Sequence, residues 1–247
     1  MMIDPDVVED HHAAWQALAE LLTRSFAAPR ILPADQETAL ASVRQLHVAA
    51  SSPLGALALN SGGILLHDGW LRIFGGSPSP DECLPSILEV NDFPAAADDL
   101  WVPIAGLIVA HDVLGGVFFL NGLRPAAGRP GVPGEVIYFD PSSLRWRRMR
   151  MSHGEWLDWC LSGDLPHFYN RRLWPGWRED VLALRADQGI VVSAPPGGGQ
   201  ELAAADCVTR TVGSMADILA RQLDAVRLRG RRLDGFLGRY PPAVPAR

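Results

Sequence analysis

Apolar residues recur at helical spacing in the N-terminal part of the chain. The pattern predicts a helix over residues 6–26, a second over 34–47, and a short third that begins at Ser52 and Pro53. Spacings of three, four and seven place five residues on the inner face of the first helix: Val8, His11, Trp15, Leu18 and Leu22. Residues 1–50 are therefore expected to form a helical extension.

The middle of the chain changes to short apolar runs that are separated by turn-forming residues. Such runs are typical of antiparallel strands, and they cover residues 65–74, 107–111, 117–121, 136–139 and 144–149. The loop over 123–134 is rich in Pro and Gly and is expected to be an exposed excursion. Strands in the centre and helices at both chain ends predict an α+β fold with an antiparallel meander.

Helical and turn patterns return after the last of these strands. Ser152 and Glu155 form a capping box that opens a helix through Leu161. A turn over 174–177 is expected to start another helix, a further strand is expected over 189–194, and an apolar stripe predicts a C-terminal helix over 214–228. We expect a single domain over 1–229, with a disordered tail over 230–247.

Composition narrows the class of protein. The chain has 247 residues, 48% of them hydrophobic, so it is large enough to bury a core without disulfides or metal. Its net charge is −6. The longest apolar stretch, 100–110, is interrupted by Pro103 and is too short to cross a membrane. The acidic N-terminus does not resemble a signal peptide, which predicts cytoplasmic residence.

Two absences limit the chemistry. All 22 basic residues are Arg, so a Schiff-base lysine and a Lys-dependent phosphate loop are excluded. Cys83, Cys160 and Cys207 are too far apart to predict a zinc site or a disulfide framework. His153 and Cys160 lie seven apart on one helix, too distant for proton transfer, and Gly197–Gly199 lack the context of a phosphate loop. No cofactor is expected.

Two His-Asp pairs, His67-Asp68 and His111-Asp112, are the candidate metal or catalytic groups. Imidazole and carboxylate are suitable metal ligands, and two pairs from neighbouring turns could meet in space. The other interpretation is architectural, because Asp at the end of a strand bonds its own turn and Gly supplies unusual backbone angles. We favour the architectural interpretation. His11 and His12 are adjacent on a helix and cannot both grip one ion unaided.

An arginine-rich run at the end of the meander is the candidate nucleic-acid site. Its basic residues are interleaved with Trp146 and Met149: Arg145, Arg147, Arg148 and Arg150. Guanidinium groups contact phosphates and Trp can stack on a base. A charged edge strand that discourages sheet-to-sheet association has the same pattern. Because the net charge is negative, we expect no nucleic-acid partner.

Five blocks in the central region resemble a known bacterial family. They are DGWLRIFGG (68–76), AHDVLGGVFFLNG (110–122), GEVIYFDP (134–141) with Trp146, WLDW (156–159) and WPGW (174–177). Their order over residues 54–190 resembles an uncharacterised domain-of-unknown-function family, DUF2625, and more distantly the SUKH (Smi/Knr-like) superfamily. The resemblance implies helices packed on a curled antiparallel sheet, and it implies a protein-binding role, since many SUKH proteins are immunity proteins that neutralise bacterial toxins.

The leading functional hypothesis is thus a non-enzymatic module that binds another protein. The acidic chain suits a basic partner, such as a toxin domain, because opposite charges raise the encounter rate. The expected partner contacts lie at a groove on the sheet: Trp70, Arg72, Asp112, Gly115, Gly116 and Trp146. The alternative is an enzyme or a small-ligand or metal-binding protein with a pocket around His67, Asp68, His111 and Asp112.

Overall fold

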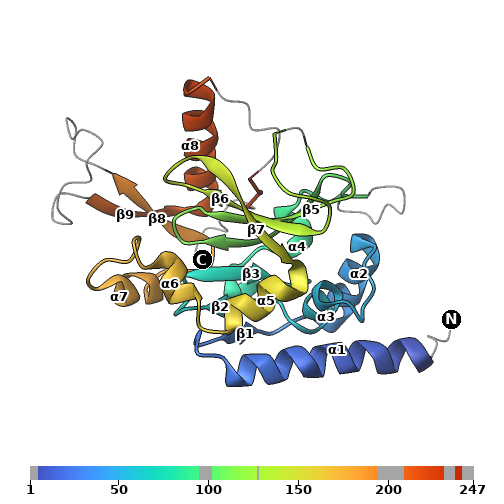
Figure 1. The fold of residues 1–247 in the computed structure, drawn as a ribbon. Helices are drawn as coiled ribbons and strands as arrows, with labels where there is room; N and C mark the ends of the chain where they lie inside the picture. Colours follow the sequence, from blue (N-terminus) through green and yellow to red (C-terminus); the bar gives the residue numbers. More distant parts are fainter. Residues whose placement is uncertain (1–4, 95–101, 127, 194–208, 231–236, 241–247) are drawn as a thin grey trace.

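A seven-stranded antiparallel sheet runs through the centre of the protein (Figure 1). The structure is a computed structural model, which describes residues 5–94, 102–126, 128–193, 209–230 and 237–240. The strands are β1 (Arg30–Leu32), β2 (Gly63–Leu66), β3 (Leu71–Phe74), β4 (Gly106–Asp112), β5 (Val117–Asn121), β6 (Glu135–Asp140) and β7 (Arg145–Ser152). Each strand pairs with the next one along the chain, which confirms the predicted α+β meander.

Helices from both halves of the chain cover one face of this sheet. They are α1 (Pro5–Arg24), α3 (Pro53–Asn60), α5 (His153–Leu161) and α6 (Leu165–Tyr169), and α2 (Gln36–Leu46) packs against α3. Helices α1, α3 and α5 contact one another, and Figure 1 shows them on the same side of the sheet. Trp156 of α5 packs on Phe118, and Phe168 of α6 packs on Tyr138, with ring centroids 5.2 Å and 5.1 Å apart.

The C-terminal part of the chain packs on the other side. A two-stranded sheet of β8 (Gln188–Ser193) and β9 (Thr209–Ser214) contacts α8 (Met215–Leu228), and Figure 1 places α8 and α1 on opposite sides of the large sheet. Two bonds join this part to the turn after β4, because Ile190 donates its N–H to the Val113 carbonyl and Gln222 donates its side-chain amide to the Leu114 carbonyl. The remaining elements are η1 (Pro80–Glu82), α4 (Ile87–Val90) and α7 (Trp177–Leu182).

Local sequence explains several helix boundaries. Ser152 and Glu155 form the capping box predicted for α5, and Ser52 caps α3 by accepting from the Gly55 N–H. Asp35 caps α2 through the Thr38 N–H. The predicted helices over 34–47 and 214–228 and the strand over 189–194 are confirmed to within two residues.

The C-terminal tail departs from the prediction where it is described. Leu237 is fully buried and Tyr240 is 7% exposed, and Arg239 donates its N–H to the carbonyl of Val90 in α4. The expectation of a disordered tail is therefore wrong for residues 237–240, which pack against the sheet. Residues 231–236 and 241–247 lie outside the described residues, as do Gly197–Gly199 and Cys207.

Among the helices in the described part of the chain, none combines the length and the hydropathy that a membrane span needs.

Candidate functional site

The turn between β2 and β3 contains the first His-Asp pair. His67, Asp68 and Gly69 all have left-handed backbone angles, with φ of 55°, 58° and 94°. The His67 ring packs on Trp177 at 4.5 Å, and burial lowers its pKa. Asp68 points outward to an ion pair of 3.1 Å with Arg178. The two side chains of this pair therefore point in different directions, His67 toward the Trp177 ring and Asp68 toward the Arg178 side chain.

The imidazole of His111 on β4 is engaged at both nitrogens. Its Nε2 lies 2.9 Å from the Leu237 carbonyl, and its Nδ1 lies 3.2 Å from the Tyr240 hydroxyl. Because a carbonyl can only accept, Nε2 carries the proton and Nδ1 accepts from Tyr240. Burial lowers the pKa of His111 to about 3, so the ring is neutral and holds the C-terminal tail.

The carboxylate of Asp112 closes the β4–β5 turn. Its Oδ1 accepts from the N–H groups of Leu114 and Gly116 at 2.9 Å and 2.8 Å, and its Oδ2 accepts from the Tyr138 hydroxyl at 2.7 Å. Burial raises the pKa of Asp112, although the bonds from Tyr138 and Gly116 act in the opposite direction. A Cβ on Gly116 would lie 2.1 Å from Oδ2, so this close approach requires glycine.

The second pair points to opposite faces of the large sheet. Neighbouring residues of a strand alternate between faces, and the contacts agree: His111 packs edge-on against Phe74 on one side, whereas Asp112 bonds Tyr138 on the other. These two side chains cannot hold one ion together. Within the described ranges, no three His, Cys, Asp or Glu side chains gather as metal ligands.

Arg72 is a buried guanidinium whose hydrogen bonds go to backbone carbonyls. Its Nη1 donates to Ala186 at 3.0 Å and also to Gln188, and its Nε donates to Gly69 at 3.3 Å. Burial lowers the pKa of Arg72. Only 2% of the residue is exposed. Its hydrogen bonds to Ala186 and Gln188 attach the segment at the start of β8 to the large sheet.

Trp70 lies at the centre of an aromatic cluster and is fully buried. Its ring centroid lies 5.4 Å from Tyr169, 5.5 Å from Trp174 and 5.5 Å from Trp177. Aromatic rings from α6 and α7 thus cover the position at which an exposed groove was expected. The cluster is part of the core.

The expected groove is filled by the protein itself. Segment 186–188 covers Arg72, and a Cβ on Gly115 would lie 2.3 Å from the Gln222 amide of α8. Asp112 and Gly116 are buried as well. Direct contact of a partner with Trp70, Arg72 or Asp112 does not agree with this burial, which corrects the predicted position of the binding surface.

Trp146 on β7 is the residue of the expected set that remains partly exposed. It packs edge-on against Phe139 at 5.3 Å and Phe119 at 5.9 Å. Strand β7 is the last strand of the sheet, so the interpretation of the arginine run as a charged edge strand agrees with its position. All four arginines of the run are exposed: Arg145, Arg147, Arg148 and Arg150.

Two carboxylates of β6 form ion pairs with arginines of this run, and neither was predicted from the sequence. Glu135 accepts from Arg148 at 2.8 Å and 2.5 Å, and these bonds lower its pKa. Asp140 lies 3.8 Å from Arg147 and 3.0 Å from Arg172. Burial alone would raise the pKa of Asp140, but the bonds from Ser142 and the charge of Arg172 lower it overall.

The thiol and imidazole of α5 do not form a reactive pair. Burial raises the pKa of Cys160 well above its usual range, so the thiol stays protonated. Burial also lowers the pKa of His153 to about 4. Both groups are buried in the interface between α5 and the sheet, in agreement with the structural role expected for Cys160.

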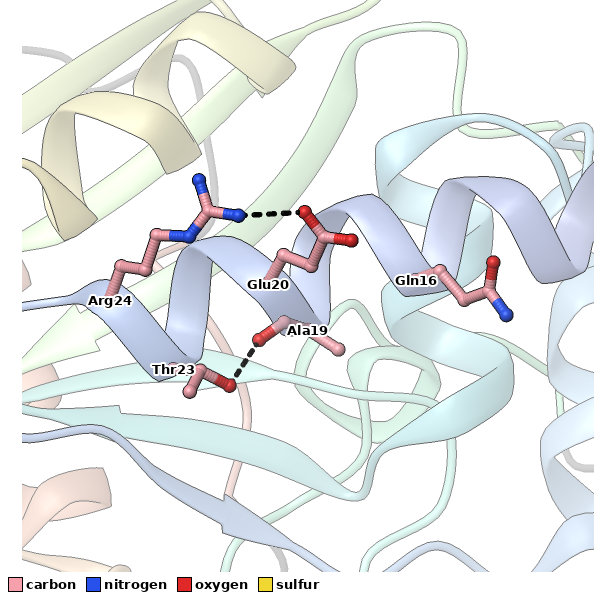
Figure 2. Close-up of a pocket in the computed structure, with 5 residues that line it drawn as sticks. All are labelled: Gln16, Ala19, Glu20, Thr23 and Arg24. Carbon is pink, nitrogen blue, oxygen red and sulfur yellow. Dashed lines mark hydrogen bonds and ion pairs between the residues drawn. The ribbon is translucent and has the colours of Figure 1, made fainter.

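A hollow on the outer side of α1 offers no chemistry of its own. Figure 2 shows that its lining residues all belong to this single helix: Gln16, Ala19, Glu20, Thr23 and Arg24. Glu20 and Arg24 form an exposed ion pair of 3.0 Å, and Thr23 donates to the Ala19 carbonyl. These are the ordinary contacts of a solvated helix face.

Comparisons with known proteins agree with the resemblance in the central blocks. Residues 5–217 match the model of a family described as protein of unknown function DUF2625. The chain is 35% identical to the uncharacterised protein YbfG of Escherichia coli (strain K12) over 186 residues, which is 74% of this chain and 80% of that protein. It is 33% identical to an uncharacterised protein of Haemophilus influenzae over 181 residues, 73% of this chain and 76% of that protein. No solved structure matches.

Proposed function

The chain belongs to the DUF2625 family, and from this premise and its surface we propose that it is a non-enzymatic protein-binding module. The observation that carries the proposal is strand β7, where the partly exposed Trp146 lies between the exposed Arg145 and Arg147. Trp and Arg are the residue types that contribute most to the binding energy of protein interfaces. We therefore propose that the binding surface lies at β7.

The arrangement of the central turns supports the same proposal. Both nitrogens of His111 and both oxygens of Asp112 form hydrogen bonds within the protein. The alternative function, an enzyme or metal site at the two His-Asp pairs, needs these groups to converge on one hollow. His111 and Asp112 face opposite sides of the sheet, so we do not adopt that alternative.

The class of partner follows from the SUKH resemblance and the charge. A role like that of a toxin-immunity protein suits a chain with a net charge of −6, because a basic toxin domain would meet it more rapidly. Raising the ionic strength should then slow association more than it speeds dissociation.

The test is a binding measurement with the products of the reading frames next to the gene. Calorimetry with wild-type protein, Trp146→Ala and Trp15→Ala compares two partly exposed tryptophans on different elements. We expect one neighbouring product to bind the wild type and Trp15→Ala equally, and Trp146→Ala about tenfold or more weakly. Equal binding by all three variants would overturn the β7 surface. Substrate turnover that is abolished in Asp112→Asn, the variant that retains the hydrogen bonds of the turn, would overturn the non-enzymatic function.

A further inference from the structure

We propose that the free edge of β7 binds an extended acidic segment of a partner protein, which adds to the large sheet as an eighth strand. This inference rests on the proposed function and names the chemistry of the partner segment. It begins from the backbone of β7, which pairs with β6 on one side. On its other side, no backbone hydrogen bond to another segment occurs within the described residues.

The regular part of this edge is long enough for a short strand. Register with β6 is continuous from Arg145 to Arg148, after which a bulge opposite Val136 places Arg150 at φ 60°. The opposite edge of the sheet, β1, has three residues. An extended peptide at β7 would gain main-chain hydrogen bonds over about four residues, and its alternate side chains would provide specificity.

Charge decides which segment fits the edge. The Arg147 and Arg148 side chains are 59% and 44% exposed, and Arg145 and Arg150 make no ion pair within the described part of the chain. A second copy of β7 would bring arginine against arginine, and like charges directly opposite one another destabilise a strand pair. Carboxylates opposite Arg145 and Arg147 would form charge-assisted hydrogen bonds with their guanidinium groups, whereas Arg148 is already held by Glu135. The edge therefore rejects a second copy and favours Asp or Glu.

Strand alternation gives the order of residues in the segment. Arg145 and Arg147 lie on the face of Asp140 and Tyr138, whereas Trp146 lies on the other face, opposite Phe139. A paired segment would place acidic residues beside Arg145 and Arg147 and an apolar residue beside Trp146. The expected pattern is acidic, apolar, acidic. A partner that is basic overall can carry such an acidic segment, because net charge governs the encounter of the two proteins, whereas the segment in contact with β7 responds to the nearby arginines. Exposed charges beyond about 8–10 Å are largely screened at physiological salt.

The experiment uses the full chain and three synthetic peptides, measured by fluorescence anisotropy at physiological salt. The first peptide alternates Glu with Ile, and the second alternates Lys with Ile. The third has the sequence of the first, but the backbone amides on the edge that would face β7 are N-methylated, so they cannot donate hydrogen bonds to the strand. Protein variants are Arg145→Glu/Arg147→Glu and a matched control, Arg221→Glu/Arg229→Glu, which makes the same charge change at one exposed position of α8 and at the exposed residue that caps its C-terminus.

We expect the Glu-Ile peptide to bind at least about tenfold more tightly than either other peptide. The β7 variant should lose about tenfold or more of this affinity, and the α8 variant should stay within about twofold. Equal binding of the methylated peptide, equal losses in both variants, or no binding of the Glu-Ile peptide would overturn strand addition. If a neighbouring gene product binds through Trp146 in that last case, the proposed function stands and this inference alone fails.

Discussion

Replacing Asp112 by Ala should destabilise the protein strongly, because the carboxylate is the acceptor for three donors of the β4–β5 turn. The Tyr138 hydroxyl and the Gly116 N–H are buried and lie 2.7 Å and 2.8 Å from it, while Leu114 is partly exposed. Without the carboxylate, water could reach the Leu114 N–H. The two buried donors would be left without partners.

The expected loss in the free energy of unfolding follows from those two donors. A buried polar group without a partner costs about 1–3 kcal/mol, so the two together cost about 4 kcal/mol. Burial raises the pKa of Asp112, which means that the native carboxylate itself carries a desolvation cost that Ala removes. We therefore expect a net loss of about 3 kcal/mol in the free energy of unfolding, or about 6–12 °C in Tm for a chain of this size.

Urea and thermal denaturation of Asp112→Ala, Asp112→Asn and Asp68→Asn measure this prediction. Asp112→Asn should cost about 1 kcal/mol, because the amide oxygen still accepts from the turn and the amide nitrogen can donate to Tyr138. Asp68→Asn should cost less than about 1 kcal/mol, since its ion pair with Arg178 is partly exposed and Asn tolerates left-handed angles. An Asp112→Ala variant within about 1 kcal/mol of wild type would refute the architectural role.

Three further measurements test other parts of the account. Burial lowers the pKa of His153 to about 4 and that of His111 to about 3, so below about pH 6.5 the unfolded chain, with a His pKa of about 6.5, binds more protons than the folded chain. The stability that each neutral imidazole contributes is present well above pH 6.5 and falls by about 2 kcal/mol at pH 5. Urea titrations at each pH should therefore show a loss of about 4 kcal/mol at pH 5 in the wild type and about 2 kcal/mol in His153→Phe. Arg72→Leu should cost about 3 kcal/mol by urea denaturation, because the carbonyls of Ala186 and Gln188 lose their donor, and a variant as stable as wild type would contradict this role. In the C-terminal tail, Tyr240→Phe should lower the free energy of unfolding by about 1 kcal/mol, because it removes the hydrogen bond to His111. Gly238→Ala should lower it by about 2 kcal/mol or more, because Gly238 has φ 114° and a Cβ would lie 2.7 Å from His111. The reverse order of melting temperatures would count against the docked tail.

Most of the fold could be predicted because long elements have periodic patterns. The helix α8 shows an apolar stripe, and α5 begins at a capping box that is visible in the sequence. Ser86 and Glu89 form a second capping box that opens α4, so this four-residue helix could have been found by the same rule. The three-residue strand β1 is too short to show a period, and its position is set by pairing with β2.

The C-terminal tail was harder to predict because its composition misleads. Arg, Gly and Pro are typical of a disordered end, but Leu237 and Tyr240 are buried, and Tyr240 stacks on His111. The partner of these two residues lies far away in the sequence. Composition cannot reveal such a contact.

The candidate site shows the same limit. Sequence reasoning identified His111 and Asp112 and favoured an architectural role, but it could not supply the partners, because Tyr138, Leu237 and Tyr240 become neighbours only through the sheet and the tail. It also placed Trp70 and Arg72 on an exposed groove. An Arg in a short strand is normally exposed, and its burial here depends on carbonyls of a segment more than a hundred residues later.

The protonation state of His111 tests the central claim most directly, because an architectural imidazole and a ligand imidazole behave differently. Nitrogen-detected NMR of ring-labelled histidine, followed from pH 8 to pH 5 with and without added Zn²⁺, reports the tautomer and the pKa. We predict that His111 stays neutral with its proton on Nε2 throughout and that Zn²⁺ leaves its signals unchanged. Titration of His111 near pH 6.5, or a shift of its ring nitrogens on addition of Zn²⁺, would contradict the account.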